Sequence, residues 1–177
     1  MIRVVGHDPA WPAKFKAEAE RIAEAIGEAT VRIHHIGSTA IPQTKAKPII
    51  DILLEVTSLE VLDQKAPMLE ALGYEVMGEF GIPNRRYFRL DDFDGTRTHQ
   101  IHAFEAGVPN VIRHLAFRDY MRAHPSVAQE YGALKEYLAN AHPHDRAAYM
   151  DGKDVFVKEH ERRALLWASN MGVVPAA

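Results

Sequence analysis

The stretch HHIGSTAIPQTKAKPIIDILLEV, residues 34–56, decides the fold. It contains a glycine-serine pair, Gly37-Ser38, then a loop with proline and lysine, and then an apolar run with one aspartate, Asp51. The residues before Gly37 predict a strand that ends there, and the apolar run predicts a second strand with proline near its start. A carboxylate in so apolar a strand costs several kcal/mol unless it has a partner, so Asp51 needs an explanation.

Length and composition indicate one compact globular domain. The chain has 177 residues, of which 47% are hydrophobic and 25% are charged, and its net charge is −3. This charge gives no overall attraction to nucleic acid or to a membrane surface, so neither is expected as a partner. The absence of cysteine excludes disulfides, thiolate nucleophiles and cysteine-bound zinc.

The sequence also predicts a cytoplasmic protein. The first residues lack the apolar core of a signal peptide. No apolar run approaches the roughly 18 residues that a membrane span needs. No pattern in the sequence indicates an oligomeric state.

Apolar periodicity and turn residues predict helices around a sheet. A helix is expected from about residue 8 to Gly27, and a second one over residues 58–72. Three short strand-like segments follow, separated by glycine, proline, asparagine and aspartate. Further helices are expected from about residue 109 onward.

This order of elements predicts an α+β fold: a mixed sheet of about five strands, flanked by an N-terminal helix and C-terminal helices. We expect a single domain over residues 1–177, with a core over about 8–106 and a helical part over about 109–170. The closing residues, GVVPAA, are expected to fray.

Alternation along the second strand separates its two faces. One face is apolar and must pack on helices; it consists of Ile50, Ile52, Leu54 and Val56. The other face carries Asp51 and Glu55. A bound cation or a basic substrate site would explain these carboxylates. A salt bridge to Lys47, Arg86 or Arg89, or an exposed strand end, would explain them as well.

The glycine-serine pair favours a binding site. Glycine lets backbone amides approach a ligand closely, and a serine hydroxyl binds phosphate oxygen. Ser38 precedes Asp51 by thirteen residues. A glycine-serine turn followed by a strand aspartate therefore indicates a phosphate site beside a carboxylate.

Longer segments resemble a known family. HIGSTAIPQTKAKPIIDI looks like the signature of the GrpB family, and the resemblance continues through GIPNRRYF, RTHQIHAF and RHLAFRDYMRAHPSVAQEYGALK. The turn and the strand aspartate also resemble the nucleotidyltransferase superfamily with the DNA polymerase β-like fold. The resemblance implies a nucleotidyltransferase-like topology of the sheet. Some members of the GrpB family are domains fused to dephospho-CoA kinase.

The resemblance also implies roles for individual residues. In active nucleotidyltransferases the glycine-serine turn binds the triphosphate, and two acids spaced two positions apart on the next strand hold Mg²⁺. This implies that Gly37, Ser38 and Thr39 bind the cofactor and that Asp51 is catalytic and binds metal. Leu53 stands at the second acid position and cannot bind a metal, so a standard two-metal site is not expected.

His102 occurs where a third acid is expected, on a strand face that it shares with Gln100. With Asp51 it would hold Zn²⁺ or Mn²⁺, or it would act as a general base. A plain hydrogen bond to Asp51 or to a backbone carbonyl would also account for this histidine. Lys47 and Arg86 are the basic residues expected to contact phosphate.

Two functions are consistent with these residues. The first is nucleotidyl or phosphoryl transfer to a small molecule, with a nucleoside triphosphate and a divalent metal (Mg²⁺, Mn²⁺ or Zn²⁺) as cofactors. The second is an accessory module that binds a nucleotide or a metal without catalysis, for example one linked to coenzyme A biosynthesis. The set of Gly37, Ser38 and Asp51 favours the first function, and Leu53 favours the second.

Overall fold

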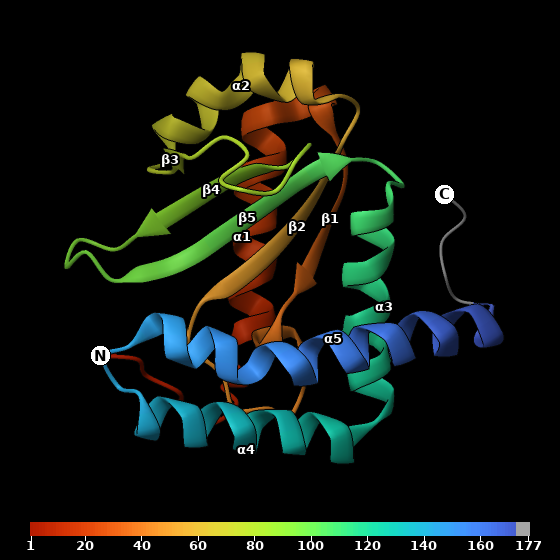
Figure 1. Cartoon of the computed structure of the whole chain (residues 1–177). Helices are drawn as coiled ribbons and strands as arrows, with labels where there is room; N and C mark the ends of the chain where they lie inside the picture. Colours follow the sequence, from red (N-terminus) through yellow and green to blue (C-terminus); the bar gives the residue numbers. More distant parts are fainter. Residues whose placement is uncertain (173–177) are drawn as a thin grey trace.

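The computed structural model describes residues 1–172. Residues 173–177, which hold most of the segment expected to fray, lie outside the described residues. Figure 1 shows the arrangement of the elements, which are α1 (Trp11–Ile26), β1 (Thr30–Ile36), β2 (Ile50–Val56), α2 (Leu59–Ala71), β3 (Glu75–Val76), β4 (Arg86–Asp91), β5 (Arg97–Glu105), α3 (Pro109–Ala123), α4 (Pro125–Ala141) and α5 (Arg146–Met171).

The five strands form one mixed sheet in the order β1-β2-β5-β4-β3. β1 is antiparallel to β2, and β2 is parallel to β5. β4 is antiparallel to both β5 and β3. The α+β class and the five-stranded sheet are therefore confirmed, while the assignment of residues 1–177 to one domain stays a prediction.

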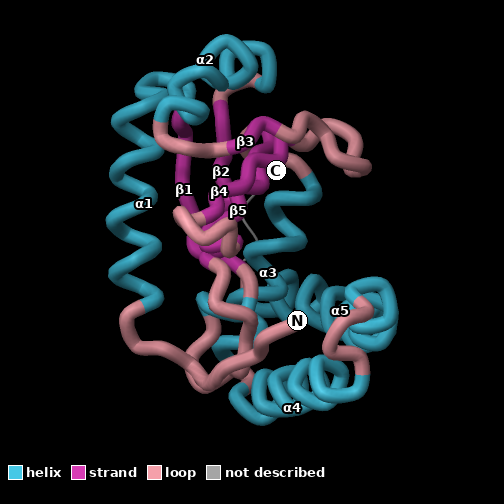
Figure 2. The backbone as a smooth tube through the Cα atoms, turned by 90° about the vertical axis from the view of Figure 1, so that its left-hand side faces the viewer, coloured by secondary structure: helices cyan, strands magenta, loops and turns pink. Residues whose placement is uncertain are grey.

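Helices cover the sheet on both faces. α1 and α2 lie on one face, as the turned view in Figure 2 shows. Ile52 and Leu54 of β2 are fully buried in one core with Ile22 of α1 and Leu62 of α2. This is the apolar strand face that alternation predicts, and its burial fixes the register of β2.

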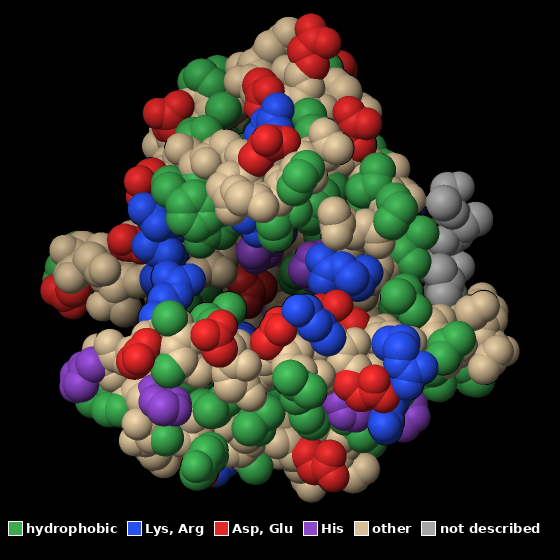
Figure 3. All heavy atoms as spheres, in the orientation of Figure 1, with side chains coloured by type: hydrophobic (Ala, Val, Ile, Leu, Met, Phe, Trp, Pro, Cys, Tyr) green, Lys and Arg blue, Asp and Glu red, His purple; other side chains and the backbone are tan. Residues whose placement is uncertain are grey.

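The opposite face meets α3, and the other two helices lie beyond it. Leu53 of β2 shares a core with Phe104 of β5 and with Val111 and Leu115 of α3. A separate core joins α3, α4 and α5 and includes Tyr131. Figure 3 shows the molecule hollowed between the sheet and α5, with acidic, basic and histidine side chains on the walls.

Local sequence signals set the ends of several helices. Gly27 has a φ of 53° and ends α1. Ser58 caps α2 by accepting a hydrogen bond from Val61 N at 3.1 Å. Asp145 caps α5 by accepting one from Ala148 N at 2.9 Å. Across residues 1–172, no helix combines the length and the apolar character needed to cross a membrane.

Candidate functional site

Gly37 joins β1 to a short 3₁₀ turn that holds Ser38 and Thr39. Its φ is 72°, in the left-handed region that residues with a Cβ rarely adopt. A Cβ at this position would also lie 2.6 Å from Oδ2 of Asp51, because the preceding residue, Ile36, pairs with Asp51 across β1 and β2. Glycine is therefore required where the turn meets the carboxylate.

The structure brings His102 to Asp51. Nε2 of His102 lies 3.3 Å from Oδ1 of Asp51, and both side chains are largely shielded from solvent. In the parallel pairing of β2 and β5, Gln100 is the direct neighbour of Asp51. Nδ1 of His102 faces the guanidinium of Arg85 at 3.4 Å. Because a guanidinium only donates, Nδ1 accepts from Arg85 and Nε2–H donates to Asp51. This geometry fits the role of hydrogen-bond partner, whereas a metal ligand or a general base would need Nε2 without its proton.

Leu53 leaves no room for a second acid. Its side chain is 0% exposed and lies in the core that β2 and β5 make with α3. A carboxylate there would be buried without a partner. Within residues 1–172, no group of three or more His, Cys, Asp or Glu side chains gathers closely enough to hold a metal ion. The protein groups around Asp51 therefore lack the ligands of a two-metal centre.

Glu55, the other carboxylate on this face of β2, has a structural role. It is buried and accepts hydrogen bonds from Arg32 at 3.1 Å and from the backbone N–H of Gly107 at 3.1 Å. His34 Nε2 lies 2.6 Å from it. Burial alone would raise the pKa of Glu55, but these hydrogen bonds outweigh burial and lower it. Of the two carboxylates, only Asp51 is directed to an open site.

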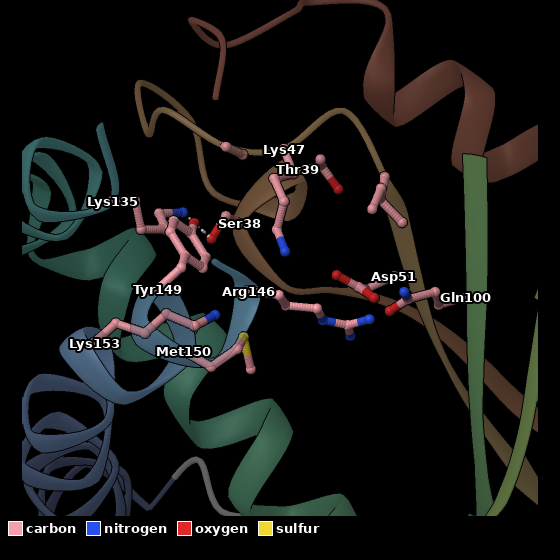
Figure 4. A pocket seen from close by; sticks show the side chains of 12 residues that line it. Ser38, Thr39, Lys47, Asp51, Gln100, Lys135, Arg146, Tyr149, Met150 and Lys153 are labelled. Carbon is pink, nitrogen blue, oxygen red and sulfur yellow. Dashed lines mark hydrogen bonds between the residues drawn. The ribbon is translucent and has the colours of Figure 1, made fainter. Parts of the chain in front are cut away.

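A cavity of about 150 Å³ lies beside Ser38 and Asp51. We call it the first cavity. Figure 4 shows that its walls combine the glycine-serine turn and the strands with side chains from α4 and α5. Nζ of Lys135, in α4, donates a hydrogen bond to Oγ of Ser38. The basic side chains in the lining are Lys47, Lys135, Arg146 and Lys153.

Burial and mutual repulsion weaken the proton affinity of these lysines. Burial, together with the charge of Lys153, lowers the pKa of Lys135 to about 7. Burial and the charge of Lys47 lower the pKa of Lys153 to about 8. Burial and Arg146 lower the pKa of Lys47 as well. The charge of Asp51 raises all three pKa values, but by less than the other effects lower them. Asp51 is the one carboxylate that the described residues contribute to the lining. The first cavity therefore has an excess of positive charge.

Tyr149 of α5 adds a neutral polar group to the same cavity. Among the described residues, no group forms a hydrogen bond with its buried hydroxyl. Its ring lies under the ammonium groups of Lys47, at 4.9 Å from the ring centroid, and of Lys153, at 5.5 Å. These cation–π contacts hold both lysines beside the cavity.

The structure gathers most of the residues predicted from sequence. Thr39 and Lys47 line the first cavity together with Asp51. Arg86 is not among them, because its guanidinium is bound by both carboxylate oxygens of Asp63 in α2, at 2.8 and 3.0 Å. Arg86 thus supports the contact between β4 and α2 instead of the cavity.

Sequence reasoning missed the basic residues from the helical part, Lys135, Arg146 and Lys153. One signal was present: Lys135 lies four residues after Tyr131, and Lys153 lies four residues after Tyr149, so each lysine shares a helix face with a buried tyrosine. A lysine on the buried side of a helix needs a reason, as Asp51 does in its strand.

Comparisons with known proteins agree with this architecture. The crystal structure of conserved protein GrpB from Enterococcus faecalis matches with a TM-score of 0.87 and 42% identity, over 92% of this chain and 97% of that chain. Terminal uridylyl transferase 4 from Trypanosoma brucei, with bound dUTP, matches with a TM-score of 0.55 and 10% identity, over 94% of this chain and 55% of that chain. At such low identity the second match shows the fold alone, which is nucleotidyltransferase-like.

Sequence relatives are of two kinds. Protein YqkA of Bacillus subtilis is 44% identical over 166 residues, which are 94% of this chain and 48% of YqkA. A dephospho-CoA kinase of Mycobacterium leprae is 31% identical over 195 aligned positions, which are 96% of this chain and 48% of the kinase. The chain thus spans about half the length of each of these relatives. A family model described as GrpB protein matches residues 1–163. The chain belongs to the GrpB family.

Proposed function

We propose that this chain binds a nucleoside triphosphate with its phosphates in the first cavity and transfers a nucleotidyl or phosphoryl group to a small molecule. One observation carries the proposal: four basic side chains surround a cavity that also holds Ser38 and Asp51. A polyphosphate would supply the negative charge that these cations need. The nucleotidyltransferase-like fold, and the dUTP bound to the trypanosomal enzyme, support a nucleotide as the ligand.

The polar groups of the first cavity suit phosphate oxygens. Lys135 already donates to Ser38, and phosphate oxygens would take further hydrogen bonds from its ammonium group. The hydroxyl of Tyr149, which no described residue pairs, would donate to another oxygen. The volume of about 150 Å³ suits the phosphate chain, with the nucleoside lying outside.

The side chains around Asp51 can hold one divalent ion but not two. Mg²⁺ is commonly held by one or two carboxylates together with substrate phosphates. Asp51 with phosphate oxygens satisfies this pattern, whereas buried Leu53 prevents a second protein carboxylate. His102, at 3.3 Å from Asp51, would add a nitrogen ligand for Mn²⁺ or Zn²⁺. Such an ion, when bound, neutralises charge on the phosphate oxygens.

Transfer then requires a base that takes the hydroxyl proton and cations that stabilise the negative charge on the leaving phosphate. The acceptor's hydroxyl oxygen bonds to phosphorus, and the bond from phosphorus to the leaving phosphate oxygen breaks, with its electron pair remaining on that oxygen. The hydroxyl proton passes to a carboxylate oxygen of Asp51, and His102 orients that carboxylate by donating from its Nε2–H to Oδ1 at 3.3 Å. Lys135 and Lys153 offset the charge that develops on the leaving phosphate.

The second candidate function is a nucleotide-binding accessory module without catalysis. Leu53 favours it, because one protein carboxylate is fewer than active nucleotidyltransferases use. The dephospho-CoA kinase from Mycobacterium leprae, which extends well beyond the matched region, makes a coenzyme A enzyme a reasonable partner for such a module.

Both functions require nucleotide binding, which calorimetry and thermal denaturation can test. The ligands are ATP, GTP, CTP and UTP, each with Mg²⁺, Mn²⁺ or Zn²⁺. A ligand at 100 times its Kd stabilises the native state by about 2.7 kcal/mol. For a chain of this size the Tm should rise by roughly 5–10 °C. Lys153→Met should remove most of this rise, while Lys158→Met, an exposed lysine on the same helix, should preserve it.

Turnover separates the two functions. Release of pyrophosphate or nucleoside diphosphate, measured with a pool of phosphorylated and hydroxylated metabolites, should occur in the native chain and be lost in Asp51→Asn. Binding without turnover would favour the accessory module. If no nucleotide changes the Tm with any of the three metals, both functions are wrong.

A further inference from the structure

A second cavity of about 350 Å³ adjoins the first. The two share Lys47, Ile49, Gln100 and Arg146, so their common boundary lies next to Asp51. In Figure 4, the side chain of Arg146 extends from α5 toward Asp51 and Gln100. Of these two cavities, only the second is lined by Arg3 and Arg97. A molecule bound there would have one end beside the carboxylate.

The second cavity is strongly basic. Its lining includes four cations, Arg3, Lys47, Arg97 and Arg146, and residues 1–172 contribute no carboxylate to it. Asp91 pairs with Arg97, but no ion pair within the described residues involves Arg3 or Arg146. In a chain with a net charge of −3, this concentration of positive charge is a local feature.

Arg146 stands at a helix end that disfavours positive charge, next to the capping residue Asp145. It is the first residue of α5, where the helix dipole favours negative charge and opposes a cation. Its charge also lies close enough to Lys47 to lower the pKa of that lysine, after the larger effect of burial. A ligand with a dianionic group between these side chains would relieve both costs.

Size and charge together indicate the class of ligand. Ligand cavities commonly measure about 300–1,000 Å³, which the second cavity satisfies and the first does not. An uncharged nucleoside has no need of four cations. Arginine forks match phosphate oxygens, and several cations suit a dianion better than a single carboxylate.

We propose that the second cavity binds the acceptor of the transfer reaction and that this acceptor is a small phosphate ester, held by Arg3, Arg97 and Arg146. This inference rests on the proposed function, because a cavity can bind an acceptor only if the protein is a transferase. The phosphate group of the acceptor sits against the arginines, and its free hydroxyl points toward Asp51 and His102. Transfer follows the bond changes given above, with no further co-reactant.

Calorimetric titration with inorganic phosphate tests the second cavity. The protein is first saturated with Mg²⁺ and α,β:β,γ-bismethylene-ATP, an analogue that can transfer neither a nucleotidyl nor a phosphoryl group and that the proposed function places in the first cavity. Phosphate should still bind, and sodium acetate at matched ionic strength should not compete. Arg3→Gln and the double variant Arg3→Gln/Arg97→Gln should weaken phosphate binding at least tenfold. Lys158→Met should change it less than twofold, because that lysine is exposed and lines neither cavity.

Each other outcome overturns the inference in a recognisable way. If Lys153→Met abolishes phosphate binding and Arg3→Gln does not, phosphate occupies the first cavity. If acetate displaces phosphate with similar affinity, or if a single-stranded oligouridylate displaces it in an Arg3-dependent manner, the ligand is not a small phosphate ester.

The same titration separates this inference from the proposed function. Binding of the ATP analogue without binding of phosphate would overturn the inference and leave the proposed function intact. Arg3-dependent binding of phosphate without any binding of the analogue would support the second anion site and overturn the proposed function.

Discussion

Nζ of Lys135 donates a hydrogen bond to Oγ of Ser38, a residue 97 positions earlier in the chain. The bond connects α4 with the glycine-serine turn, so both parts of the chain form one wall of the first cavity. Because a buried ammonium group is costly, this contact makes Lys135 the most informative residue to change.

Lys135→Met should lower triphosphate affinity at least tenfold without lowering the Tm at pH 7. Lys135 is 3% exposed, and burial lowers its pKa to about 7, so the folded state disfavours its charge. Methionine fills a similar volume without this cost. Thermal denaturation and calorimetry measure the two effects. A loss of stability above about 1 kcal/mol would mean that the bond to Ser38 outweighs burial, contrary to this expectation.

The stability difference between Lys135→Met and the native chain should depend on pH. In the unfolded chain the lysine has its ordinary pKa of 10.5, and in the folded chain a pKa of about 7. Between these values the unfolded state binds more protons, so the native chain gains stability relative to the variant as pH rises. Denaturant unfolding at pH 7, 8.5 and 10 measures the trend, and a constant difference would contradict it.

Triphosphate binding should take up protons at pH 8. Before binding, Lys135 and Lys153 are partly neutral at this pH, since burial lowers their pKa values to about 7 and about 8. A polyanion favours the charged form of both, so affinity should fall as pH rises from 6 to 9. Calorimetry in buffers of different ionisation enthalpy counts the protons. Equal binding enthalpies in all buffers would show that the lysines do not titrate with the ligand.

Asp51→Asn should remove the effect of Mg²⁺ on triphosphate affinity. The substitution keeps the shape of the side chain and removes the charge that would hold an ion against phosphate. Without metal, the variant should bind triphosphate at least as tightly as the native chain, because the cavity has lost its one described carboxylate. Asp63→Asn, at the pair with Arg86, is the control and should leave metal dependence unchanged.

Gly37→Ala should destabilise the fold more than Gly78→Ala. Both glycines have positive φ, 72° and 63°, so both substitutions carry a backbone cost of about 1 kcal/mol. A methyl group at Gly78 would enter open space, whereas at Gly37 the new Cβ would meet Oδ2 of Asp51 at 2.6 Å. Denaturant unfolding measures the difference. Adding Asp51→Ala to Gly37→Ala should recover part of the loss, and no recovery would show that the clash is not with Asp51.

Strand alternation accounts for what could be predicted of the site from sequence. It places Asp51 on the face opposite the apolar residues of β2, and it puts His102 and Gln100 on one face of β5. The structure pairs these strands in parallel, which brings His102 to Asp51. Alternation does not identify ion-pair partners, so it could not show that Arg86 forms an ion pair with Asp63.

The basic walls could not be predicted in the same way. Lys135 and Lys153 reach the first cavity because α4 and α5 pack beyond α3. Helical periodicity shows which face of a helix is buried but not which residues that face contacts. Arg3 and Arg97 are far apart in sequence and come together only through the tertiary fold. The glycine-serine turn, Asp51 and His102 could therefore be predicted from sequence, whereas the basic walls of the cavities could not.

Leu53 limits how this protein could be engineered. Because its side chain belongs both to the strand that carries Asp51 and to the core beneath α3, one substitution to aspartate would place a charge among Phe104, Val111 and Leu115. To introduce a second acid, a neighbouring core residue such as Leu115 would first have to be replaced by a smaller one, so that water could solvate the new carboxylate. A second acid therefore requires several residues to change at once, because a single substitution of Leu53 by aspartate or glutamate would bury an unpaired charge and destabilise the protein.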